Sequence, residues 1–360
     1  MKNLAYRLFR KDTATPPATG KPAEEFRPLP LLSNPHLQTV IAAFWSGPTF
    51  DHPTREQVLR LPDGDGLILY DSVPPGWKPG DKMALLIHGL TGSHRSYPVQ
   101  RTGRQLLERG VRVVRIDQRS AGRAIPLSRH TYHSGRSDDM RAVVAEMHRW
   151  SPTSPITVVG FSLGGNLALK LAGEAATHPV PGLERVVTVG PPIDLARCCA
   201  LMSLPRNRQY EKFFLRGLLS EARQRHRCFP DLPRLRFPQR MTMRVFDDLY
   251  TAPTCGFADA LDYYRRASAL PLVPRINVPT LILTARDDPF IAVEPIESLP
   301  KTDYLTVQIL SHGGHLGFLG WDGQGGVRWA DRRIVNWVLR EDLPACAFSP
   351  GGAAVRRRGH

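Results

Sequence analysis

The chain has 360 residues, of which 42% are hydrophobic and 22% are charged, and it carries a formal net charge of +15. This composition is typical of a globular protein, and the length allows one large α/β domain with an insertion or two ordinary domains. No stretch approaches the roughly 18 consecutive apolar residues of a membrane helix, and the basic N-terminus lacks the apolar core of a secretory signal. We therefore expect a cytoplasmic protein. The five cysteines are odd in number and have no C-x-x-C spacing, which indicates neither a disulfide framework nor a zinc site.

The first 30 residues predict an extended or disordered arm, since residues 11–30 are rich in proline, alanine and threonine. A hairpin is expected next, because two apolar runs flank a turn sequence at 62–66. Strands and helices then alternate, and we expect Ser137 to cap one of these helices. The predicted strands lie at 84–88, 111–116, 156–159, 185–189, 280–284 and 305–310, and the first two predicted helices at 97–109 and from about 137. Such alternation indicates a mainly parallel, twisted sheet with helices on both faces.

The alternation stops at about residue 191 and resumes only at Thr280. Between 191 and 270 the sequence has arginines and aromatics at helical spacing, which predicts a helical cap inserted above the sheet. Its aromatics can equally be packing between cap helices. We expect the domain to span 31–342, with this cap inside it, and residues 343–360 to form a disordered tail.

A G-x-S-x-G sequence follows the strand predicted at 156–159 and precedes a helical pattern at 166–172. A serine on a sharp strand-to-helix turn has its hydroxyl exposed, and the flanking glycines leave room for close chain crossing. This context predicts that Ser162 is a nucleophile. The five residues are Gly160, Phe161, Ser162, Leu163 and Gly164.

An acid and a base follow at the ends of two later predicted strands, in the order Ser, Asp, His that α/β-hydrolases use. A serine hydroxyl needs a base to take its proton, and a carboxylate orients that base. We assign Asp288 as the acid, with Asp287 as its competitor, because the turn at 285–288 resembles the acid turn of this fold. We assign His315 as the base over His312, because two glycines precede it.

Two backbone N–H groups should stabilise the developing oxyanion. We expect one from Leu163, directly after the nucleophile, and one from Leu90 in the loop after the strand at 84–88. His88 in the same loop is expected to be structural. No cofactor is expected, since no G-x-G-x-x-G or Walker A sequence occurs in the required context. The H-x-x-H pairs His130/His133 and His312/His315 lack a third ligand and predict no metal site.

Seven motifs together resemble the YheT-like branch of the α/β-hydrolases, whose animal members are the abhydrolase-domain lipases. They lie at 33–40, 88–93, 132–135, 160–166, 257–260, 287–290 and 312–318. The resemblance implies an α/β-hydrolase fold and a Ser-Asp-His hydrolase of carboxylic esters, and it agrees with the five site residues assigned above. One departure is Ser120 after Arg119, where the branch usually has glycine. We expect no membrane-anchoring helix of the kind that the animal relatives have, and therefore a soluble or at most peripheral protein.

The leading hypothesis is a serine esterase that cleaves short-chain esters or acylglycerols through an acyl-enzyme. An acyltransferase would use the same three residues, and a non-catalytic lipid- or ligand-binding protein would retain only the pocket. Residues 196–245 contain twelve lysines or arginines against three acids. This excess indicates either contact with an anionic membrane surface or an arginine-rich solvated face. Nucleic acid is not expected, because no binding module or stacking pattern accompanies the basic residues. The sequence does not predict an oligomeric state.

Overall fold

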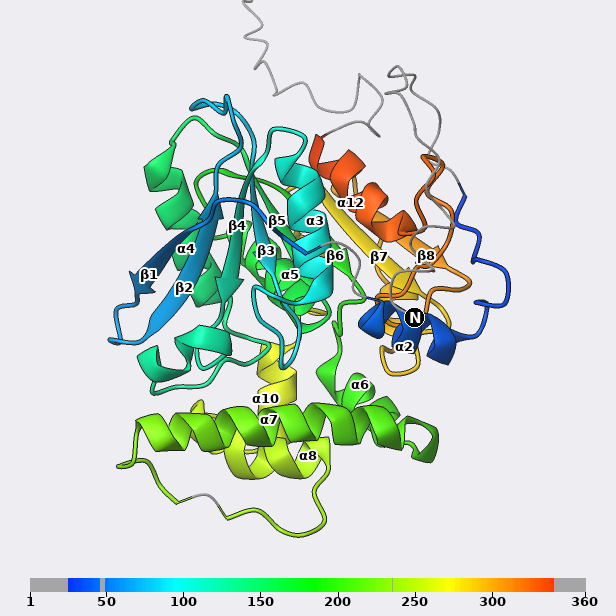
Figure 1. Ribbon diagram of the computed structural model, residues 1–360. Coiled ribbons are helices and arrows are strands. Elements are labelled where there is room, and N and C mark those ends of the chain that lie inside the picture. Colours follow the sequence, from blue (N-terminus) through cyan, green and yellow to red (C-terminus); the bar gives the residue numbers. More distant parts are fainter. Residues whose placement is uncertain (1–24, 46–48, 235, 340–360) are drawn as a thin grey trace, which may run out of the picture.

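A single mixed β-sheet organises the computed structural model, which describes residues 25–45, 49–234 and 236–339 (Figure 1). Its eight strands lie in the order β1-β2-β4-β3-β5-β6-β7-β8. The strands are β1 (Arg55–Arg60), β2 (Gly66–Ser72), β3 (Met83–Ile87), β4 (Arg112–Asp117), β5 (Ile156–Phe161), β6 (Leu183–Val189), β7 (Thr280–Ala285) and β8 (Leu305–Leu310). Strands β1 and β2 form the expected antiparallel hairpin, and from β4 to β8 all pairs are parallel. The predicted mainly parallel sheet is therefore confirmed.

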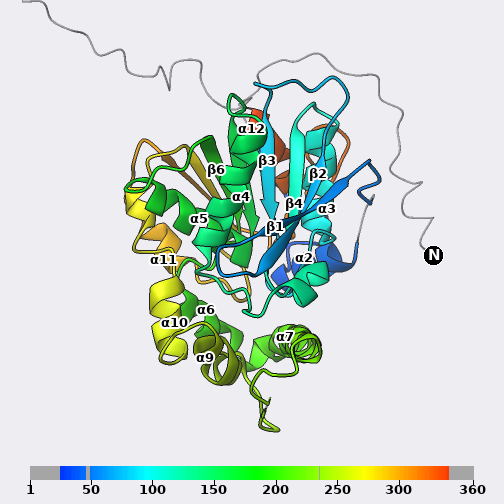
Figure 2. The same cartoon turned by 90° about the vertical axis from the view of Figure 1, so that its left-hand side faces the viewer.

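Helices cover both faces of the sheet and bury one apolar cluster on each side (Figures 1 and 2). Helices α3 (Tyr97–Leu107) and α12 (Trp329–Leu339) pack together on one face, and α4 (Ser137–Trp150) and α5 (Leu163–Ala175) pack on the other. Every residue of the central strands β3, β5 and β7 is buried. Burial on both faces explains why these strands are continuously apolar rather than alternating.

The expected capping role of Ser137 is wrong. Ser137 is the first residue of α4, and its side chain makes no capping bond. Its hydroxyl donates instead to Glu174 Oε2 on α5, at 2.7 Å. A tertiary contact thus replaces the local one that the sequence favours. Asp138 and Asp139 lie in the first turn of α4, where the helix dipole favours negative charge.

The segment expected to form a cap contains helices that lie beyond one end of the strands (Figures 1 and 2). The longest, α7, crosses below the sheet in Figure 1. The helical elements are α6 (Leu195–Met202), η2 (Pro205–Asn207), α7 (Arg208–Cys228), α8 (Met243–Phe246), η3 (Asp247–Thr251), α9 (Ala252–Thr254) and α10 (Ala260–Ala267). Their apolar side chains contribute to three clusters distinct from the two on the faces of the sheet, and one of the three also contains Phe290, Ile291 and Ala292. We refer to these helices as the cap helices.

Four further helical elements connect or flank the sheet: α2 (Pro35–Phe44), η1 (Gly122–Leu127), η4 (Val273–Arg275) and α11 (Glu294–Glu297). Residues 25–30 of the expected arm lie against the domain, where Phe26 is buried beside Phe318 and Trp329. The rest of that arm, and the tail expected from 343, lie outside the described residues. Within the described part of the chain, no helix combines the length and apolarity that crossing a bilayer requires.

Candidate active site

Ser162 lies on a strained turn between β5 and α5. Its backbone has φ 53° and ψ −120°, a conformation that non-glycine residues rarely adopt. Both glycines of the motif are needed for close backbone packing. A Cβ on Gly160 would lie 2.2 Å from the carbonyl oxygen of Gly164, and one on Gly164 would lie 2.5 Å from that of Ile87. The spacing of the glycines therefore follows from the sharpness of the turn that presents the serine.

The side chains of Ser162, His315 and Asp288 form a continuous hydrogen-bonded chain. His315 Nε2 lies 3.0 Å from Ser162 Oγ, and His315 Nδ1 lies 2.8 Å from Asp288 Oδ2. The other carboxylate oxygen accepts the N–H groups of Phe290 and Ile291, at 3.1 and 3.0 Å. These donors fix the position of the carboxylate, which can then hold the imidazole in one orientation. The three residues follow the ends of β5, β7 and β8.

The competing residues Asp287 and His312 form a separate pair beside this chain. Asp287 Oδ1 accepts the N–H of Gly314 at 2.9 Å, and Oδ2 lies 3.4 Å from His312 Nδ1. The side chain of His312 is 47% exposed. Burial raises the pKa of Asp287. Because it binds the loop just before His315, Asp287 supports the loop rather than the imidazole.

Leu90 and Leu163 line the same pocket as Ser162. Leu163 is the first residue of α5, so its N–H has no acceptor within the helix, and the helix dipole favours negative charge there. Among the described residues, the N–H of Leu90 has no hydrogen-bond acceptor. We call residues Gly89–Thr91 the β3 loop. A Cβ on Gly89 would lie 3.1 Å from Ser162 Cβ, so this loop passes directly beside the serine.

His88 binds the backbone, as expected. Its Nδ1 lies 2.8 Å from the carbonyl oxygen of Gly89, and its Nε2 accepts the N–H of Gln118 at 3.3 Å. Full burial lowers the pKa of His88, which keeps the ring neutral.

Helix α2 supports the histidine loop, a role that the sequence did not reveal. Thr39 Oγ1 accepts the N–H of His315 at 2.9 Å. Gln38 Oε1 accepts the N–H of Leu319 at 2.7 Å, and its amide donates to the carbonyl oxygen of Leu319 at 3.1 Å. A Cβ on Gly314 would lie 2.4 Å from the carbonyl oxygen of Pro35. The motif at 33–40 was found by resemblance alone, and these contacts give its physical reason.

The pocket above Ser162 is mostly apolar, and it has two carboxyl groups but no lysine or arginine in its described lining. Glu221 of α7 accepts a hydrogen bond from the Tyr132 hydroxyl at 3.1 Å, and burial raises the pKa of this carboxyl to about 8. Asp247 accepts hydrogen bonds from Thr251 and Tyr264, each at 2.7 Å, and burial raises its pKa to about 6. The apolar lining comes largely from the cap helices: Leu195, Met202, Phe214, Leu218, Met243 and Phe246.

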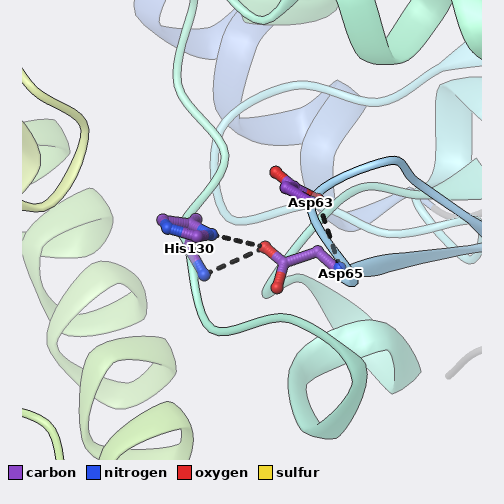
Figure 3. Close-up of side chains that lie close together, drawn as sticks. All are labelled: Asp63, Asp65 and His130. Atoms are coloured by element: carbon purple, nitrogen blue, oxygen red, sulfur yellow. Dashed lines mark hydrogen bonds and ion pairs between the residues drawn. The ribbon is translucent and has the colours of Figure 1, made fainter.

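A cluster of Asp63, Asp65 and His130 has the side-chain types of a metal site (Figure 3). A guanidinium already pairs with both acids, because Arg119 Nη1 lies 2.6 Å from Asp63 Oδ2 and 2.7 Å from Asp65 Oδ2. His133 is not part of the cluster: its Nδ1 accepts the N–H of Gly135 at 3.0 Å. The arrangement fits an arginine-centred ion network better than a cation site.

Ser120 stands where the resemblance leads one to expect glycine, and its φ of 53° explains that expectation. The preceding Arg119 binds Asp139 through Nε and Nη2, at 2.7 and 2.8 Å. Neither Arg119 nor Ser120 lines the pocket above Ser162. The departure therefore affects the conformation of a turn more directly than the choice of substrate.

The sheet, the strained serine and the histidine at the ends of parallel strands are features of one class of protein. A family model described as "alpha/beta hydrolase fold" matches residues 85–320, and the chain belongs to this family. Among solved structures, an esterase of Pyrococcus furiosus has a TM-score of 0.55 at 17% identity, covering 81% of this chain and 91% of its own. At that identity the likeness shows the fold alone.

Within the family, the chain is a member of the YheT-like branch, as the motifs indicated. It is 35% identical to the "Putative esterase YheT" of Escherichia coli over 87% of this chain and 93% of that protein. It is 26% identical to the monoacylglycerol lipase of Saccharomyces cerevisiae, over 74% of this chain and 62% of that one. It is also 26% identical to human phospholipase ABHD3, over 65% of this chain and 58% of that protein. The chain thus spans about 60% of the length of these two eukaryotic relatives.

Proposed function

We propose that this protein is a serine hydrolase that cleaves carboxylic esters through an acyl-enzyme, with Ser162 as nucleophile, His315 as base and Asp288 as the acid that orients the base. That the chain is an ester hydrolase follows from its family and from relatives named esterase, monoacylglycerol lipase and phospholipase. The single observation that carries the finer proposal is the hydrogen-bonded chain from Ser162 Oγ through His315 to Asp288.

The proposed reaction has two steps. His315 Nε2 takes the proton of Ser162 Oγ as the hydroxyl attacks the ester carbonyl, and then gives it to the departing alcohol. A water molecule next attacks the acyl carbon while His315 takes a proton from it; the bond to Ser162 Oγ then breaks, His315 returns the proton to Oγ, and the carboxylic acid leaves. In both steps the N–H groups of Leu90 and Leu163 stabilise the negative carbonyl oxygen, and each donor of this kind contributes about 10² to 10³ in rate.

The substrates we propose are short-chain esters or acylglycerols. The apolar lining from the cap helices suits an acyl chain, because burying it removes apolar surface from water. Glu221 and Asp247 supply hydrogen-bonding groups for hydroxyls. With two carboxyl groups and no lysine or arginine in the described lining, this pocket disfavours an anionic group.

The test is hydrolysis of p-nitrophenyl esters from acetate to palmitate by the wild type and Ser162→Ala. We expect kcat to fall by about 10⁴ or more in the variant, and the preferred chain length to report the depth of the pocket. Equal rates for both proteins on every ester would overturn the proposal. Labelling of Ser162 by a fluorophosphonate would then favour an acyltransferase, and no labelling a binding protein.

We also propose that the outer face of α7 contacts anionic membrane surfaces. Five exposed cationic residues lie along this helix: Arg208, Lys212, Arg216, Arg223 and Arg227. Among the described residues none of the five has an ion-pair partner. Phe213, on the same helix, is 61% exposed. A basic face with an exposed aromatic suits the boundary between headgroups and acyl chains.

A further inference from the structure

We propose that helix α7 holds the β3 loop in its working conformation, so that Gly217, Tyr132 and Glu221 are positioning residues for the oxyanion donor at Leu90. The inference rests on the proposed ester hydrolysis and adds to it a coupling between the cap helices and the reacting site. Three independent contacts support it.

The first contact is a hydrogen-bonded relay from the β3 loop to α7. Thr91 has a φ of 54°, which is unfavourable for a branched residue and persists only where its surroundings hold it. Its N–H donates to the Tyr132 hydroxyl at 2.8 Å, and that hydroxyl donates to Glu221 Oε2 at 3.1 Å. Because Thr91 directly follows Leu90, the relay fixes the peptide next to the proposed donor.

The second contact is a close approach of Gly217 to Thr91. A Cβ on Gly217 would lie 2.6 Å from Thr91 Cγ2 and 2.8 Å from Thr91 Cβ. Glycine inside a helix costs about 1 kcal/mol relative to alanine, and Gly217 lies well inside the 21 residues of α7. A side chain at position 217 would overlap Thr91, which explains why a glycine stands there despite its cost to the helix. Gly217 and Glu221 are four residues apart and therefore face the same side of the helix.

The third contact is apolar packing at both ends of the catalytic arrangement. Leu90 packs against an apolar cluster that includes Leu215, Leu218 and Ala222 of α7. Near the N-terminal end of α7, Tyr210 packs against Phe290, with ring centroids 5.2 Å apart. The ring of Phe290 in turn lies 4.2 Å from that of His315. Helix α7 thus contacts the β3 loop directly and the histidine through one aromatic ring, so a shift of α7 would move the donor relative to Ser162.

The decisive variant is Gly217→Ala, measured on a p-nitrophenyl ester with Ser162→Ala as the blank. We expect kcat to fall about 10-fold to 100-fold with KM changed less than 3-fold, because Leu90 donates to the oxyanion and not to the bound ester. The melting temperature should change little, since the roughly 1 kcal/mol that alanine adds to the helix offsets much of the cost of displacing Thr91. Ser220→Ala, at an exposed position of α7, is the matched control and should keep wild-type kcat.

Rescue separates positioning from a general effect on folding. Thr91→Gly removes the three side-chain atoms that would lie nearest to the new methyl group, and glycine adopts a φ of 54° without strain. We expect Gly217→Ala to lower kcat in the wild type but less than 3-fold in a Thr91→Gly background. Tyr132→Phe, which removes the acceptor of the Thr91 N–H, should also lower kcat more than it raises KM.

Wild-type kcat in folded Gly217→Ala together with wild-type kcat in Tyr132→Phe would overturn the inference. Equal loss of kcat from Gly217→Ala with and without Thr91→Gly would also overturn it, since the effect would then bypass the β3 loop. Failure of the proposed function looks different. In that case the wild type itself would not exceed Ser162→Ala on any ester.

Discussion

The Thr39 hydroxyl accepts the backbone N–H of His315 at 2.9 Å, across 276 residues of the chain. The same hydroxyl donates to the carbonyl oxygen of Pro35 at 2.7 Å, so its hydrogen points into α2 and its lone pair points at the histidine loop. His315 is thereby held from three sides: by Thr39 at its backbone, by Asp288 at Nδ1 and by the Phe290 ring. A helix near the start of the chain is therefore part of the support of the proposed base.

Replacing Thr39 with valine should lower kcat on p-nitrophenyl esters about tenfold. Valine keeps the shape but leaves the buried N–H of His315 without its acceptor, a loss of about 1 to 3 kcal/mol. Thr39→Ser retains the hydroxyl and should keep most of the activity. If the valine and serine variants have equal kcat, the hydrogen bond does not position the histidine.

The two neighbouring acids should differ sharply when each is changed to its amide. Asp288→Asn should lower kcat by about 10⁴, because the amide favours the wrong tautomer of His315. Asp287→Asn should cost far less, about tenfold or below, since Asp287 binds the Gly314 N–H and not the imidazole. Steady-state kinetics of both variants decides the assignment. A larger loss from Asp287→Asn would transfer the acid's role to Asp287.

The local turn of the site and the residues after its parallel strands could be read from the sequence, whereas the contacts that hold their loops could not. A strand, a G-x-S-x-G turn and a helix adjoin in the chain, so Ser162 and the backbone of Leu163 are visible as one pattern. Parallel strands bring their ends to one edge of the sheet, which is why an acid and a histidine after later strands could be expected near the serine. Asp287 and His312 could not be separated from Asp288 and His315 in this way. Their roles depend on loop conformations that spacing does not determine.

Other features depend on contacts between residues far apart in the chain. Thr39 meets His315 and Glu221 meets Tyr132 only after the sheet and the cap helices have packed. At Ser137 the sequence predicted a local contact that does not form. Its side chain bonds to Glu174 on another helix instead of capping α4. The burial of an individual charged side chain also could not be predicted from the sequence. Glu221 lies among arginines in the chain, yet its side chain points away from them into an apolar pocket.

Burial of Glu221 should make stability depend on pH. Its pKa is about 8 in the folded protein and about 4.5 when unfolded, so the folded state binds this proton more tightly. The resulting stability is fully present below about pH 4.5, declines as the pH rises, and is lost above about pH 8. Glu221→Gln removes this dependence. We therefore expect the melting temperature of the variant to rise relative to wild type by several degrees between pH 5 and pH 9.

Thermal unfolding of both proteins across that range measures the effect, and Glu294→Gln on α11 controls for the removal of one negative charge at an exposed site. A constant difference between Glu221→Gln and wild type at every pH would contradict the shifted pKa.

The basic face of α7 should bind anionic vesicles, and charge reversal there should greatly weaken binding. Each lysine or arginine near an anionic surface contributes about 1 kcal/mol, and salt screens that attraction over about 10 Å at 0.1 M. We expect the wild type to sediment with vesicles containing phosphatidylserine at low salt, and not with phosphatidylcholine alone. The variant Lys212→Glu/Arg216→Glu/Arg223→Glu should lose most of this binding.

A matched variant, Arg109→Glu/Arg275→Glu/Lys301→Glu, makes the same change in net charge at exposed positions just before β4, β7 and β8, at the other end of the strands. Because it leaves α7 intact, it should bind nearly as well as wild type. Equal loss from both variants would mean that net charge alone drives association, and equal sedimentation of the wild type with neutral and anionic vesicles would mean that the arginines of α7 form a solvated surface.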